Sequence, residues 1–179
     1  MITAVTSALL VCVPASATPY AGNTIVTWYP NDHRCLDAAA EHIHDNGTPV
    51  QLWTCYDDSY RNQRWSIRHQ GYDGVGELYQ IVNLESSRCL DATAEWGGVN
   101  GTPIQLWDCY GPGQTNQLWY IRWHDPGFTI YTIESVAFHR LLDAKAEQLC
   151  CPHTPIQLWD DYGPGQTNQR WNILAPGQR

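Results

Sequence analysis

Three sets of side chains in this sequence have the chemistry needed to bind a hydroxyl-rich, neutral molecule such as a sugar. Each set combines a carboxylate, an aromatic ring and an amide. A carboxylate accepts hydroxyl protons, an amide both donates and accepts, and an aromatic ring packs against C–H groups. The sets are Asp37, Trp53 and Asn62; Asp91, Trp107 and Asn116; and Asp143, Trp159 and Asn168.

The three sets recur because the chain contains a threefold internal repeat. Gln-Leu-Trp stands at 51–53, 105–107 and 157–159, and Asn-Gln-x-Trp follows each copy at 62–65, 116–119 and 168–171. The copies are spaced 52–54 residues apart, which is typical of a repeat architecture. We refer to the segments of about 24–67, 78–121 and 130–173 as repeats 1, 2 and 3.

The elements that must position these residues are predicted to be strands. Helical periodicity is missing, whereas short apolar runs such as 79–84 and 128–133 are bounded by Asn-Gly, Gly-Pro-Gly and Asp-Pro turns. About four short strands fit into each repeat. A propeller needs at least about four blades, so three units favour an all-β, pseudo-threefold closed barrel capped by hairpins, the β-trefoil.

Alternation along a strand separates the inner from the outer residues of each Gln-Leu-Trp. Because successive side chains point to opposite faces, Leu52, Leu106 and Leu158 are predicted to face the barrel, and Gln and Trp to face outward. The Trp residues could instead belong to the core, and the Asp residues could merely cap turns. Fixed offsets between Asp, Trp and Asn in every repeat favour a binding role. The closing residues of each repeat are predicted core positions: Trp65, Trp119 and Trp171.

The motifs Arg-Cys-Leu-Asp-Ala, Gly-Thr-Pro-x-Gln-Leu-Trp and Asn-Gln-x-Trp resemble those of the ricin B-chain type lectins. This family includes related (family 13-like) carbohydrate-binding modules, and the resemblance covers about 24–174. It implies that the Asp binds sugar hydroxyls, the Trp stacks on the sugar and the Asn adds a hydrogen bond at three competent sites. It further implies a supporting or orienting role for Gln51, Gln63, Gln105, Gln117, Gln157 and Gln169.

Seven cysteines are present, and the family resemblance implies a partner for four of them. It implies disulfides between Cys35 and Cys55 and between Cys89 and Cys109. Repeat 3 has Leu141 and Asp161 in the matching places and instead carries the adjacent Cys150 and Cys151. For that pair a strained vicinal ring, an intermolecular bond and free thiols all remain open. The Cys and His spacing does not favour a zinc site, and no metal or cofactor is expected.

The ends and the charge of the chain define its class. Residues 1–17 are predicted to be a signal peptide, with an apolar run from Ala4 to Ala15 and a small-x-small cleavage site, leaving 18–179 as one domain. The formal net charge of −8 argues against nucleic acid and anionic membranes as partners. No later segment is long enough to insert into a membrane.

These features predict a secreted lectin with three similar sugar sites for galactose-type sugars or a neutral polysaccharide. The alternative is a sugar-targeting or adaptor subunit, with a protein partner, in a larger secreted toxin or glycosidase assembly. An enzyme is not expected, because an active site is normally one asymmetric constellation and every candidate carboxylate occurs in triplicate.

Two further triplets recur without a settled role. The first is Glu41, Glu95 and Glu147, which form either a pocket rim or ordinary solvated charges. The second is Tyr56, Tyr110 and Tyr162, which form either a pocket wall or packing.

Overall fold

A computed structural model describes residues 22–28, 34–125, 127, 129–149 and 153–178 of the chain. The predicted signal peptide and the Cys150–Cys151 pair lie outside the described residues, so both remain predictions. Within the described residues no helix is long and apolar enough to cross a membrane.

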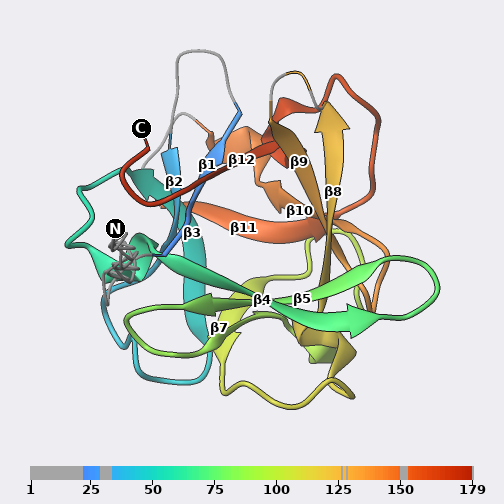
Figure 1. Ribbon diagram of the computed structural model, residues 1–179, viewed down its shortest axis with the longest axis horizontal. Helices are drawn as coiled ribbons and strands as arrows, with labels where there is room; N and C mark the ends of the chain where they lie inside the picture. Colours follow the sequence, from blue (N-terminus) through green and yellow to red (C-terminus); the bar gives the residue numbers. More distant parts are fainter. Residues whose placement is uncertain (1–21, 29–33, 126, 128, 150–152, 179) are drawn as a thin grey trace, which may run out of the picture.

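Each repeat contributes four strands, as predicted (Figure 1). Repeat 1 holds β1 (Thr24–Thr27), β2 (Arg34–Ala38), β3 (Thr48–Thr54) and β4 (Trp65–Tyr72). Repeat 2 holds β5 (Glu77–Asn83), β6 (Cys89–Ala92), β7 (Ile104–Trp107) and β8 (Trp119–Asp125). Repeat 3 holds β9 (Ile130–Ser135), β10 (Leu141–Ala144), β11 (Thr154–Trp159) and β12 (Trp171–Leu174).

Short 3₁₀ turns complete each repeat. One turn precedes the closing strand: η1 (Arg61–Gln63), η3 (Thr115–Gln117) and η5 (Thr167–Gln169). Another follows the second strand of repeats 2 and 3: η2 (Ala94–Trp96) and η4 (Ala146–Gln148).

Strand pairing closes a barrel and caps one end of it. The first and last strands of the repeats pair antiparallel in the order β1–β12–β9–β8–β5–β4, and a bridge between Asn23 and Trp65 closes the ring. The middle strands form three hairpins, β2–β3, β6–β7 and β10–β11. These hairpins meet through β3–β7 and β11–β3 pairing and through a bridge between Pro103 and Gln157. This is the predicted β-trefoil.

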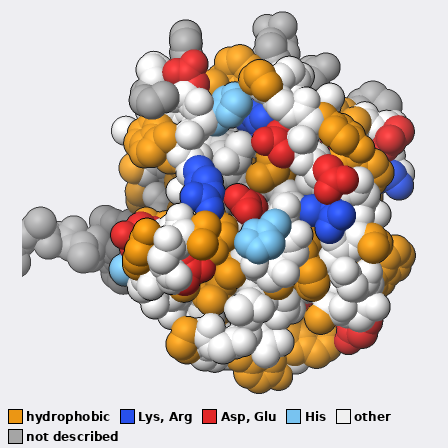
Figure 2. All heavy atoms as spheres, turned by 90° about the vertical axis from the view of Figure 1, so that its right-hand side faces the viewer, with side chains coloured by type: hydrophobic (Ala, Val, Ile, Leu, Met, Phe, Trp, Pro, Cys, Tyr) orange, Lys and Arg blue, Asp and Glu red, His pale blue; other side chains and the backbone are white. Residues whose placement is uncertain are grey.

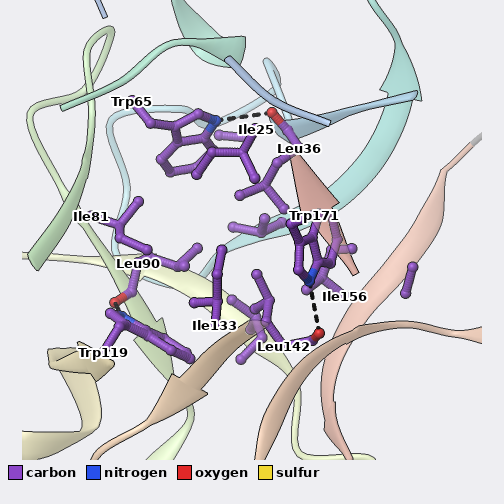
Figure 3. Close-up of a cluster of buried hydrophobic side chains, with 14 of the residues drawn as sticks. Ile25, Leu36, Trp65, Ile81, Leu90, Trp119, Ile133, Leu142, Ile156 and Trp171 are labelled. Carbon is purple, nitrogen blue, oxygen red and sulfur yellow. Dashed lines mark hydrogen bonds between the residues drawn. The ribbon is translucent and has the colours of Figure 1, made fainter. Parts of the chain in front are cut away.

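The core has the same threefold order (Figure 3). The closing Trp residues are fully buried, and their indole Nε1 atoms donate to the carbonyl oxygens of Leu36, Leu90 and Leu142 at 3.0–3.1 Å. These bonds satisfy the polar tips of buried aromatic rings, which would otherwise destabilise the core. The inward-facing Leu residues of the Gln-Leu-Trp motifs are also fully buried, which confirms the predicted alternation.

Asparagines in the Asn-Gly turns tie each repeat to the next one. Asn46 accepts from Arg88 and from the backbone N–H of Asp108, and it donates to the Asp108 carboxylate. Asn100 makes the same three bonds with Arg140 and Asp160. The following glycines, Gly47 and Gly101, have φ of +91°, a left-handed conformation that favours glycine.

Both disulfides implied by the family resemblance are present, Cys35–Cys55 and Cys89–Cys109. Each joins the second strand of a repeat to the loop that follows Gln-Leu-Trp. In repeat 3, Leu141 and Asp161 stand in those places, and Asp161 pairs instead with the buried Arg170 at 3.2 Å.

We expect Cys89→Ser/Cys109→Ser to lower the free energy of unfolding by about 3 kcal/mol, because the bond closes a loop of 20 residues in the unfolded chain. Urea denaturation monitored by Trp fluorescence would measure the loss. Every variant should also carry Cys150→Ser and Cys151→Ser, so that thiol exchange does not contribute. An unchanged midpoint would contradict the expected stabilisation.

Candidate functional site

The predicted Asp, Gln and Asn residues of each repeat form one hydrogen-bonded network. In repeat 1, Asp37 on β2 lies opposite Gln51 on β3, and Gln51 Nε2 donates to Asp37 Oδ1 at 3.0 Å. Asn62 and Gln63, from η1, donate to Asp37 Oδ2 at 2.8 and 2.9 Å. The carboxylate therefore joins a hairpin to the turn that precedes the closing strand.

The network is repeated almost atom for atom in the other two repeats. Asp91 accepts from Gln105, Asn116 and Gln117 at 2.9–3.0 Å. Asp143 accepts from Gln157, Asn168 and Gln169 at 2.7–3.0 Å. All three Asp residues are buried, with 3–4% of their surface exposed.

Counting donors and acceptors shows what each group leaves for a ligand. Two carboxylate oxygens offer about four acceptor positions, and the amides occupy three of them. Each Asp therefore has one acceptor position left for a hydroxyl proton of a ligand. Asn62 donates both amide protons, to Asp37 and to the Ala38 carbonyl, so it presents its oxygen only. Asn116 and Asn168 do the same.

The glutamines of Asn-Gln-x-Trp hydrogen-bond both to the Asp of their network and to the loop that follows Gln-Leu-Trp. Gln63 donates to Asp37 and to the Thr54 carbonyl, and it accepts from the Tyr56 N–H. Gln117 repeats these bonds. In repeat 3, Gln169 Oε1 is buried without a hydrogen-bond partner among the described residues. The loop with Asp161 in place of a cysteine therefore supports the third network less completely.

Each network forms the floor of a surface pocket. The first pocket is lined by Asp37, Gln51, Trp53 and Asn62, the second by Asp91, Gln105, Trp107 and Asn116, and the third by Asp143, Gln157, Trp159 and Asn168. Their volumes are about 340, 180 and 250 Å³ respectively. The Trp side chains are partly exposed beside the buried carboxylates. Each pocket thus presents an acceptor, an amide oxygen and an aromatic ring.

Two recurrent triplets whose role was open in the sequence also line the pockets. Glu41, Glu95 and Glu147 belong to the first, second and third pocket, and so do Tyr56, Tyr110 and Tyr162. Trp96, on η2 of the same repeat as the second pocket, is exposed but is not among the residues that line that pocket.

Sequence reasoning missed two residues of the first pocket. Tyr60 lies in the wall made by repeat 1, and His153 comes from repeat 3. The signal for Tyr60 was its register with Gln114 and Gln166 of the other repeats. His153 could not be found from its own repeat, because its contacts are with repeat 1.

Burial controls the protonation of the three carboxylates. Desolvation raises the pKa of Asp37, Asp91 and Asp143 above the usual value, while the amide hydrogen bonds oppose the rise. The pKa of Asp143 reaches about 6, and the Glu147 charge adds to that increase. Asp37 differs, because His153 acts to lower its pKa.

Comparison with known proteins agrees with this architecture. The family model described as "Ricin-type beta-trefoil lectin domain-like" matches residues 25–107 and 61–159. The beta-galactoside-specific lectin 2 of Viscum album is 31% identical over 88 residues, which are 49% of this chain and 13% of that lectin. The chain therefore matches only a small part of that relative.

Solved structures share the fold. The designed threefold-symmetric protein ThreeFoil matches with a TM-score of 0.68 at 20% identity, over 85% of this chain and 96% of that one. An exo-beta-1,3-galactanase from Clostridium thermocellum matches with a TM-score of 0.68 at 26% identity, over 87% of this chain and 30% of the galactanase. Together with the threefold motifs and the closed barrel, the family match establishes that this chain belongs to the ricin-type β-trefoil lectin family.

Proposed function

We propose that this protein is a secreted lectin that binds galactose-type sugars, or a neutral polysaccharide containing them, at its three pockets. The observation that carries the proposal is the threefold recurrence of one constellation: an immobilised carboxylate with one acceptor position left, an Asn oxygen and a partly exposed Trp. A sugar hydroxyl donates to the carboxylate, and the C–H face of the ring packs on the indole.

Galactose-type specificity rests on the relatives. The Viscum album protein is named a beta-galactoside-specific lectin, and the Clostridium thermocellum protein is an exo-beta-1,3-galactanase. Secretion is supported by the two disulfides, which persist in oxidising compartments, and by the apolar run at 4–15.

Charge agrees with a neutral ligand. The net charge is −8, and on the face shown in Figure 2 the Lys and Arg side chains are scattered among acidic and apolar ones rather than gathered. Nucleic-acid binding needs a basic patch to neutralise phosphates.

Catalysis is not part of the proposal. Glycoside hydrolysis uses two carboxyl groups in unequal roles, one of which must donate or accept a proton. Each Asp here is instead held by three amide donors, in the same way in all three pockets. Such a carboxylate is suited to hold a hydroxyl in place.

A second candidate is a sugar-targeting subunit of a larger secreted assembly. It is favoured by the lengths of the relatives, since the matches cover 13% of the Viscum album lectin and 30% of the galactanase. This role would use the same three pockets and add an interface with a protein partner.

Removing the stacking rings tests the number of sites. We expect Trp53→Ala, Trp107→Ala and Trp159→Ala each to abolish one galactose-binding site, because a lost stacking partner weakens an already shallow site by about tenfold or more. Calorimetric titration with galactose should give a stoichiometry that falls from three to zero as the substitutions are combined. Trp123→Ala is the matched control, since Trp123 is an exposed Trp on β8 outside the three pockets. The proposal would be contradicted if the pocket substitutions left the number of bound galactose molecules unchanged, or if Trp123→Ala reduced it.

The raised pKa of Asp143 predicts an acid-sensitive third pocket. Protonation near pH 6 removes the negative charge that accepts the sugar hydroxyl, so affinity in Trp53→Ala/Trp107→Ala should fall as the pH drops from 7.5 to 4.5. The second pocket, isolated in Trp53→Ala/Trp159→Ala, has no imidazole in its lining and should retain binding to lower pH.

This loss should not reflect unfolding. Because the folded-state pKa of Asp143 lies above its value of 3.8 in the unfolded chain, the folded protein binds the extra proton between about pH 6 and 3.8. The contribution of Asp143 to the free energy of unfolding therefore rises as the pH falls through that window. Near-UV circular dichroism at each pH would report the fold, and a third pocket with flat affinity would contradict the role given to Asp143.

A further inference from the structure

A turn from another repeat lies beside each pocket. Gly47, in repeat 1, lies close to the second pocket. A Cβ atom added to Gly47 would be 3.9 Å from Gln105 Oε1 of that pocket. Gly101, in repeat 2, lies close to the third pocket in the same way. A Cβ atom added to Gly101 would be 3.9 Å from the Trp159 ring. The residue in register in repeat 3 is His153, which lies beside the first pocket. Two pockets therefore have a glycine at this point, and one has an imidazole.

His153 is held in a defined orientation. Its φ is +62°, and its ring centroid lies 4.0 Å from that of Trp53, tilted by 59°. Its Nδ1 lies 3.1 Å from Gln51 Oε1. Because Gln51 Nε2 donates to Asp37, the Gln51 oxygen must face the imidazole, and an oxygen only accepts. Nδ1 therefore carries the proton, which leaves Nε2 of the neutral ring as an acceptor for a sugar hydroxyl.

The opposite end of the first pocket is also distinct. Tyr60 stands where repeats 2 and 3 have Gln114 and Gln166. Its ring stacks on Tyr56 with centroids 4.4 Å apart, and Tyr56 Oη accepts from Trp53 Nε1 at 3.0 Å. Four rings therefore line the first pocket, namely His153, Trp53, Tyr56 and Tyr60, and this pocket is also larger than the other two.

We propose, building on the lectin function proposed above, that the first pocket binds two consecutive sugar residues of a neutral galactose-containing glycan, whereas the second and third pockets bind one. Aromatic rings offer a large apolar contact area, so the rings that line the first pocket besides Trp53 can contact a second sugar. The lining carries the carboxyl groups of Asp37 and Glu41 and, apart from His153, no basic side chain, which disfavours an anionic sugar. His153 and Tyr60 are the residues that determine this preference.

Single-pocket variants test the proposal with galactose and β-1,3-galactobiose as probes. Calorimetric titration of Trp107→Ala/Trp159→Ala, which keeps the first pocket, should show the disaccharide binding about tenfold more tightly than galactose. Trp53→Ala/Trp159→Ala, which keeps the second pocket, should bind both probes with affinities that agree within about twofold.

Exchanging the distinguishing residues between repeats provides the matched control. His153→Gly and Tyr60→Gln, each placed in the first-pocket variant, introduce residues that the same fold holds at the same positions in other repeats. Both should lower the ratio of disaccharide to galactose affinity toward that of the second pocket. Gln114→Tyr in the second-pocket variant should raise that ratio.

The outcomes separate this inference from the lectin function itself. Equal ratios in the two single-pocket variants, or a ratio that His153→Gly and Tyr60→Gln leave unchanged, would overturn the two-sugar first pocket while galactose binding stands. A folded wild-type protein that binds neither probe would overturn the galactose-type function and this inference together.

Discussion

The structure depends on a buried carboxylate that is satisfied by three amides. Removing one Asp would leave Nδ2 or Nε2 donors from a hairpin and from a 3₁₀ turn without their acceptor inside the fold. Hydrogen bonds to a charged group contribute about 1.5–3 kcal/mol each, and an unmade buried bond costs a similar amount. The same carboxylate orients the hairpin, the turn and the pocket floor. The stability of the fold and the geometry of the three pockets therefore depend on one interaction, made three times.

The three repeats share the same hydrogen bonds at the floor of the pockets, but they differ in the loop that follows Gln-Leu-Trp. Repeats 1 and 2 brace the loop after Gln-Leu-Trp with a disulfide and with a glutamine oxygen that accepts from a Tyr N–H. Repeat 3 has Asp161 paired with Arg170, and Gln169 Oε1 is without a partner among the described residues. Asp143, whose pKa is raised to about 6, belongs to this repeat with fewer supporting contacts. The pockets thus share one chemistry and differ in how firmly it is held.

Much of this arrangement follows from the sequence because the relevant contacts recur at fixed offsets. The period of two within Gln-Leu-Trp correctly predicts that Leu52 is buried and that Trp53 lies outside the core. The disulfides followed from the family resemblance. The convergence of three amides on Asp37 did not, because residue types do not reveal which of several donors reach one carboxylate. His153 was missed for a related reason, since its partners lie about a hundred positions earlier in the chain.

The crossing of turns between repeats has a consequence for how such proteins change over time. We expect a substitution at Gly47, Gly101 or His153 to affect the pocket of another repeat, because each of them lies beside that pocket. We therefore expect the ligand preference of one pocket to change through substitutions in a segment of another repeat. We expect the ligand preference of a pocket to be set where two repeats meet, and not by one repeat alone.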